Sequence, residues 1–243
     1  MGNVLEFSAL LWFFVCWVGY SEYSKRRAKD RPCLSNTLDM YREDWMRGML
    51  RRDNRIADAS VVGNLERNGG FFASSCLLIL AGIITALGYT SEAMDVFSAL
   101  PFSAVPSRAI WELRLLVLLV VFVYAFFKFT WSMRMYNFVS VMIGGAPMPG
   151  DTKVTPAARE AFAASAATVC NLAGDTFNLG LRSYYYALAV VAWFIHPIAF
   201  IAASTLVVVV LYRREFCSDA LVAMRSGKVF VEPVPDEVSK SKT

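Results

Sequence analysis

The residue best placed to do chemistry inside a membrane is His196, directly before Pro197 in an apolar run from Tyr184 to Tyr212. Ionisable residues within apolar segments often mark an ion path, a proton relay or a ligand. An imidazole could bind a metal or haem iron, but the sequence has no second histidine, which excludes a bis-histidine site within one chain. The alternative is a neutral imidazole that forms a hydrogen bond near the carbonyl group that Pro197 leaves unpaired.

A second set of polar side chains, Lys128, Arg134 and Asn137, follows the apolar run from Leu115 to Phe127. These side chains could line a pocket for an anionic headgroup or substrate. Interfacial anchoring explains them equally well, because long basic side chains extend from the edge of the hydrocarbon layer to the headgroups.

The sequence contains none of the common motifs of soluble enzymes. It has no phosphate-binding loop, no GxSxG motif, no HExxH motif and no carboxylates paired at catalytic spacing. Its five cysteines are far apart and form no CxxC pair. We therefore predict no catalytic residue, no metal and no cofactor, and an enzyme is the less favoured class. The net charge of +4 gives no indication of nucleic-acid binding.

The elements that must position these residues are predicted to be membrane helices. Hydrophobic residues make up 56% of the 243-residue chain and charged residues 18%, well to the apolar side of an ordinary soluble protein. Apolar runs predict spans over about 4–20, 71–89, 110–131 and 184–212. We predict an all-α polytopic bundle of about four transmembrane helices, forming one membrane domain over 1–225 before a polar tail at 226–243.

Two further segments have the periodicity of amphipathic helices. Over 34–58, apolar side chains recur at helical spacing and arginines occupy the other face. This helix lies in the headgroup plane, docks on a partner, or packs on the protein's own cytoplasmic surface, which is the favoured interpretation. The alanine-rich segment 156–181 carries Asp175 and Asn178, so it is a poor span and is predicted to be an interfacial or bundle-packed helix.

The distribution of basic residues conflicts with the number of spans. The cluster from Lys25 to Arg31 places the end of the first span in the cytoplasm and sends Met1 across the membrane. Four spans then leave Arg213 and Arg214 outside, whereas a fifth span near 162–174 would place them inside. We adopt four spans, because the polar side chains of 156–181 would cost several kcal/mol to bury in lipid.

Much of the chain resembles a known family. The stretches FFKFTWSMRMYNFVSVMIGGAP (126–147), GLRSYYYALAVVAWFIHP (180–197) and VVVVLYRREFCSDAL (207–221) are similar to the family catalogued as domain of unknown function 599. The similarity extends to WMRGMLRRDNRIADA (45–59) and FFASSCLLILAG (71–82). The resemblance implies a small, mostly bacterial multi-pass membrane protein with four helices, and no activity. Its recognisable residues concentrate at membrane interfaces, and on this ground Arg182 joins the candidate binding residues.

These observations favour a non-catalytic accessory, assembly or scaffold component of a complex in the bacterial cytoplasmic (inner) membrane. The alternative is a small oligomeric transporter or channel in which His196, Lys128 and Arg134 line a path. A membrane enzyme that uses His196 with an exogenous cofactor is the least favoured class. The expected partners are the lipid bilayer and either another membrane protein or further copies of the chain.

Overall fold

The computed structural model describes residues 2–98 and 107–227, and every regular element in these residues is an α-helix. The helices are α1 (Gly2–Asp30), α2 (Leu34–Met49), α3 (Ile56–Gly88), α4 (Thr90–Ser98), α5 (Arg108–Gly144), α6 (Pro156–Trp193), α7 (Pro197–Phe216) and α8 (Asp219–Ser226). The prediction of an all-α protein is confirmed.

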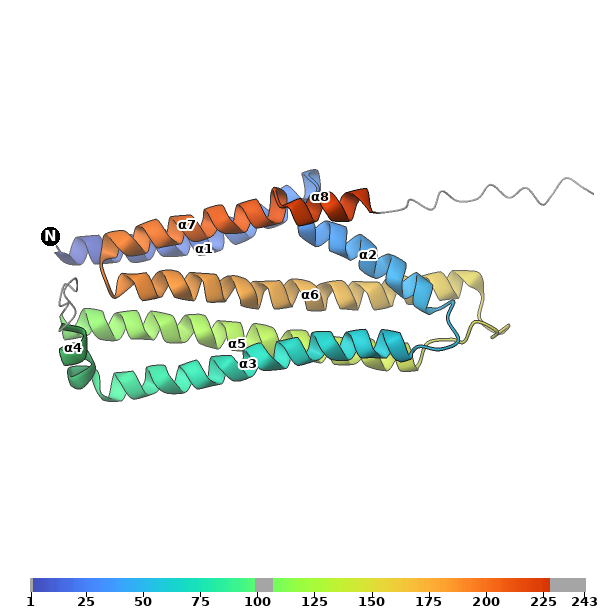
Figure 1. The fold of residues 1–243 in the computed structure, drawn as a ribbon, viewed down its shortest axis with the longest axis horizontal. Helices are drawn as coiled ribbons and strands as arrows, with labels where there is room; N and C mark the ends of the chain where they lie inside the picture. Colours follow the sequence, from blue (N-terminus) through green and yellow to red (C-terminus); the bar gives the residue numbers. More distant parts are fainter. Residues whose placement is uncertain (1, 99–106, 228–243) are drawn as a thin grey trace, which may run out of the picture.

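The long helices lie side by side, and those that follow one another along the chain run in opposite directions, so that α1 and α7 are parallel (Figure 1). α5 packs between α3 and α6, α6 also packs against α7, and α7 packs against α1. Four helical segments are long and apolar enough to cross a membrane: Val4–Asp30, Ile56–Gly88, Arg108–Gly144 and Pro197–Ser226. The chain is therefore a multi-pass membrane protein with four candidate spans, as the sequence predicts.

The segment predicted as one kinked span, 184–212, is instead the two arms of a helical hairpin. α6 ends at Trp193, a turn follows, and Pro197 begins α7. Proline disfavours a helical conformation in the residue before it, and His196 is accordingly extended at φ −161° and ψ 143°. Proline itself is favoured at the first helical position, because it has no N–H to leave unpaired. The chain therefore reverses direction where the sequence analysis expected a kink.

The predicted amphipathic helices also have different ends in the structure. α6 begins at Pro156 as expected, capped by the Thr155 hydroxyl, but it runs for 38 residues to Trp193. The segment predicted as one helix over 34–58 is divided by a turn between α2 and α3. In this turn, Arg55 donates hydrogen bonds of 2.7 Å to the carbonyl oxygens of Ala146 and Pro147.

Several long helices are longer than a bilayer requires. α5 has 37 residues and α6 has 38, or about 55 Å each at 1.5 Å per residue, against a hydrocarbon layer of about 30 Å. Their excess length packs with α2 and the start of α3 around a second hydrophobic core, formed by Met46, Met49, Leu50, Val62, Met135, Tyr136, Val139, Ile143, Ala146, Ala163, Ala166, Ala167, Cys170 and Ala173. We call this part the extension, and the opposite end of the bundle, where α6 turns into α7, the hairpin end (Figure 1).

A buried ion pair joins three helices near the hairpin end. Arg114 of α5 and Glu6 of α1 are 2.7 Å apart, and their side chains are only 2% and 12% exposed. Trp193 of α6 donates its indole N–H to the other oxygen of Glu6 at 2.6 Å. The Arg114 guanidinium also lies over the Trp193 ring. A single carboxylate therefore holds α1, α5 and α6 together at this end.

Candidate functional site

A cluster of polar side chains lies where α1, α2, α6 and α7 meet. On α6, Asp175, Asn178 and Arg182 follow one another at intervals of three and four residues, which places them on one face of the helix. This face is opposite Ser35 of α2 and Glu215 of α7. The cluster therefore links the junction between α1 and α2 to the two arms of the hairpin.

Glu215 is the central acceptor of the cluster. Its Oε1 accepts the backbone N–H of Ser35 at 3.1 Å, and its Oε2 lies 3.5 Å from the Arg182 guanidinium. Because Ser35 is in the first turn of α2, the carboxylate also benefits from the positive end of that helix dipole. The Ser35 hydroxyl donates to Asp175 at 2.8 Å, so α2 contacts both α6 and α7 through one serine.

Arg182 makes further contacts with α1. Its guanidinium is 3.4 Å from the Ser24 hydroxyl, to which it donates, and it lies over the ring of Tyr20 at 5.5 Å. The side chains of Arg182 and Glu215 are each 16% exposed. The pair is thus largely shielded from solvent and positions three helices.

A cavity of about 230 Å³ opens beside this pair and is lined by Ser24, Lys25, Ala28, Ser35, Asn36, Asp39, Asp175, Asn178, Leu179, Arg182 and Glu215. A neighbouring cavity of about 130 Å³ shares Ser35, Asn178, Arg182 and Glu215 with it. Since a water molecule occupies about 30 Å³ of liquid, the larger cavity can hold several waters or a small polar ligand. Both signs of charge line it, so it suits a hydrated or zwitterionic ligand.

Asp39, which lines the same cavity, has a raised pKa. Burial and the neighbouring Asp175 carboxylate raise the pKa of Asp39, and the opposing effect of Arg42, 2.9 Å away, does not cancel them. Asp39 therefore binds a proton at a higher pH than an exposed aspartate does.

Of the candidate residues from the sequence, the structure places only Arg182 in this cluster. His196 is exposed at the hairpin end, where its Nδ1 accepts the N–H of Ile198 at 3.1 Å and caps α7. It does not lie in the middle of a span as expected, because Pro197 begins a helix there instead of bending one.

The other three candidates lie along α5 and do not meet Arg182 or His196. Lys128 lies over the ring of Tyr124 at 5.2 Å and Arg134 over that of Phe138 at 5.6 Å, while Asn137 is exposed. These cation–π contacts fit the interfacial-anchor interpretation better than a shared pocket. The five candidates therefore do not converge on one site.

Glu215, Ser35 and Asp39 were missed as candidates from the sequence. Asp175 and Asn178 were noted, but only as reasons why 156–181 is a poor span. One signal was present in the sequence, since Asp175, Asn178 and Arg182 have the spacing of one helical face. Among the described residues, no group of three or more His, Cys, Asp or Glu is arranged to hold a metal ion.

The chain is similar to a known protein family. A family profile described as "Protein of unknown function, DUF599" matches residues 8–220, from α1 to the start of α8. No curated protein and no solved structure is significantly similar to the chain.

Proposed function

Because the chain belongs to the DUF599 family, whose function is unknown, we propose a role from its own structure: a non-catalytic accessory or scaffold component of a protein complex in the bacterial inner membrane. In this role the membrane helices anchor the extension, and the extension binds a partner protein. The proposal depends on an exposed apolar stripe on α5.

The α5 stripe consists of Phe127, Trp131, Phe138 and Val141, which are 64%, 52%, 42% and 69% exposed. Their spacing places them on one face of the helix. Within the hydrocarbon layer such residues need no partner except lipid. Phe138 and Val141, however, lie 10 and 13 residues beyond Lys128, or about 15–20 Å along the helix.

Lys128 marks the edge of the hydrocarbon layer on α5, since it lies 20 residues after Arg108 at the start of the helix, or about 30 Å, which is the thickness of that layer. Phe138 and Val141 are therefore apolar side chains exposed on the part of α5 that extends past the bilayer. Arg134 lies on the same face between Trp131 and Phe138, with its guanidinium 5.6 Å from the centroid of the Phe138 ring. Apolar side chains that are exposed outside lipid and bordered by a polar residue are typical of protein–protein interaction sites. This observation favours a partner protein as the ligand of the extension.

The interior of the bundle supports the same choice over a transporter. Five large side chains are completely buried between the helices, from the level of Lys128 to the hairpin end: Phe13, Phe129, Tyr186, Trp193 and Phe200. These large side chains fill the space between the helices, so a substrate path would need an assembly of several chains.

The basic residues support an extension on the cytoplasmic side. Nearly all Lys and Arg side chains of the described residues lie on the side of the extension, either in the half of a helix that is nearer to it or in a connection on that side. The exceptions are Arg108, Arg114 and Arg182. Arg182 is directed toward Glu215, close to the end of α7. If α6 crosses the membrane beside α7, this distribution follows the positive-inside rule, with the hairpin end outside.

Site-specific photocrosslinking in native membranes tests the proposed role. A photoreactive amino acid at Phe138 or Val141 is expected to crosslink the chain to a protein of different sequence. The matched control is Thr168, which is exposed on α6 within the same extension but has a polar side chain. Val141→Asp should abolish the crosslink formed from position 138 without lowering thermal stability, because Val141 is 69% exposed. Crosslinks only to lipid or to a second copy of the chain would contradict the proposal.

A further inference from the structure

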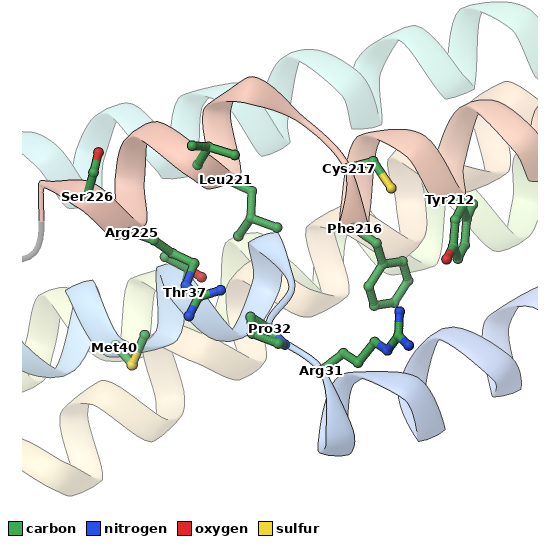
Figure 2. Close-up of a pocket in the computed structure, with 11 residues that line it drawn as sticks. Arg31, Pro32, Thr37, Met40, Tyr212, Phe216, Cys217, Leu221, Arg225 and Ser226 are labelled. Carbon is green, nitrogen blue, oxygen red and sulfur yellow. The ribbon is translucent and has the colours of Figure 1, made fainter.

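A groove of about 750 Å³ opens where the ends of α1 and α7 meet α2 and α8 (Figure 2). Thr37 and Met40 of α2 form one side, and Phe216 and Leu221 form the other. α8 is held against α2 because the Tyr41 hydroxyl donates to the carbonyl oxygen of Met224 at 2.7 Å. The groove is therefore a fixed feature of the helix packing.

Two arginines give this groove a positive charge. Arg31 and Arg225 line it, and its lining contains no Asp or Glu. Figure 2 shows the Arg31 guanidinium beside Phe216 and the Arg225 guanidinium beside Thr37, on two sides of the groove. Both arginines are exposed, and neither forms an ion pair with another described residue. The groove thus offers two uncompensated cationic groups beside apolar walls.

A second, apolar groove continues from it along the membrane-spanning part of α1 and α7. It has a volume of about 550 Å³, and Trp12, Val15, Gly19 and Val209 are among the residues that line it. Tyr212 lines both grooves. A molecule with a charged head and a long apolar chain could therefore occupy both at once.

We propose that the two grooves together bind one anionic phospholipid. Its phosphate lies between Arg31 and Arg225, and an acyl chain lies between α1 and α7. The two arginines are complementary to an anionic headgroup, whereas the extra cation of a zwitterionic choline headgroup would find no carboxylate in the lining. The position also fits, because Arg31 and Arg225 lie beyond the ends of α1 and α7, at the level expected for headgroups. This site is independent of the partner-binding stripe on α5.

Native mass spectrometry of the full chain in detergent, titrated with phosphatidylglycerol or phosphatidylcholine of the same acyl chains, tests this proposal. One phosphatidylglycerol should be retained in preference to phosphatidylcholine. The double variant Arg31→Gln/Arg225→Gln should bind phosphatidylglycerol roughly 30-fold more weakly, from about fivefold per arginine near a membrane surface. The matched control Arg26→Gln/Arg213→Gln removes the same charge from exposed positions outside the groove lining and should have little effect.

A second variant tests the acyl-chain groove without disturbing the fold. A Cβ atom at Gly19 would meet nothing within 4 Å, so Gly19→Leu fills the groove without a clash. It should weaken phosphatidylglycerol binding, whereas Gly82→Leu, at an equally open position on α3, should not. Equal retention of both lipids, an equal loss in the arginine control, or displacement of the lipid by inorganic phosphate would overturn the proposal.

Discussion

Removal of the Glu6 carboxylate should destabilise the protein far more than removal of an exposed carboxylate from the same helical bundle. Glu6 accepts from Arg114 at 2.7 Å and from the indole of Trp193 at 2.6 Å. The Nε and Nη1 atoms of Arg114 have no hydrogen-bond partner among the described residues. The variant Glu6→Leu would therefore leave a guanidinium that is 2% exposed without its counter-charge.

The magnitude follows from burial. Removing one partner of a buried ion pair typically costs about 3–5 kcal/mol, because the other charge remains buried and uncompensated. The matched control is Glu112→Leu on α5, since Glu112 pairs with Arg108 at 2.8 Å but the two side chains are 39% and 69% exposed. An exposed pair at this spacing contributes only about 0.3–0.5 kcal/mol. The two variants should thus differ by roughly a factor of ten in lost stability.

The assay is SDS-induced unfolding in mixed micelles, followed by tryptophan fluorescence. The double variant Glu6→Leu/Arg114→Leu removes both charges, and it should be clearly more stable than Glu6→Leu alone, because no buried charge is left unpaired. Equal losses in Glu6→Leu and Glu112→Leu would refute the reasoning. A double variant whose loss equals the sum of the two single losses would refute it as well.

Three further predictions address packing, topology and pH. A Cβ atom at Gly180 would lie 2.7 Å from the Phe129 ring, so Gly180→Ala should destabilise the bundle by about 1–3 kcal/mol and lower its thermal unfolding midpoint in detergent. The control Gly82→Ala should leave this midpoint unchanged, because a Cβ atom at Gly82 would meet nothing within 4 Å. On intact cells, a membrane-impermeant maleimide should label a variant whose only cysteine comes from His196→Cys, but not a variant that keeps only the exposed native Cys217, because the hairpin places the two positions at opposite ends of α7. A single span over 184–212 predicts labelling of Cys217. The raised pKa of Asp39 contributes stability that is present below the ordinary aspartate pKa of about 3.9 and is lost as the pH rises through the raised value. The unfolding free energy of Asp39→Asn, compared with that of the wild type from acid to neutral pH, should lack this loss, and parallel pH profiles would contradict the assignment.

Three of the membrane helices could be predicted because each of three apolar runs is closely followed by charged residues. The run from Phe71 to Tyr89 has no charged residue at all. It forms the last part of α3, which ends at Gly88 with Tyr89 as its C-cap. The hairpin could not be predicted from hydropathy, because the sequence on both sides of Pro197 is equally apolar. Hydropathy carries no information on the direction of the chain, and a proline is compatible with a kink as well as with a helix start.

The polar cluster was predictable only in part. Asp175, Asn178 and Arg182 share one helical face, which is a local property of the sequence. Their partners are far away in the sequence: Ser35 is 140 residues from Asp175, and Glu215 is 33 residues from Arg182. Only the packing of α2 and α7 against α6 brings these partners together. The basic pair Arg213 and Arg214 was the one sign in the sequence against a single span over 184–212.

The hairpin also has a consequence for how the chain enters the bilayer during synthesis. α6 does not qualify as a span on hydropathy, whereas α7 does. Asp175 and Arg182 of α6 find their partners on α2 and α7, and Glu215 of α7 is made last. A ribosome that has completed α6 but not α7 has therefore produced a helix in which Arg182 still lacks its counter-charge Glu215. We therefore expect α6 to dock stably in the bundle only when α7 is present, so that the two helices pack as one unit.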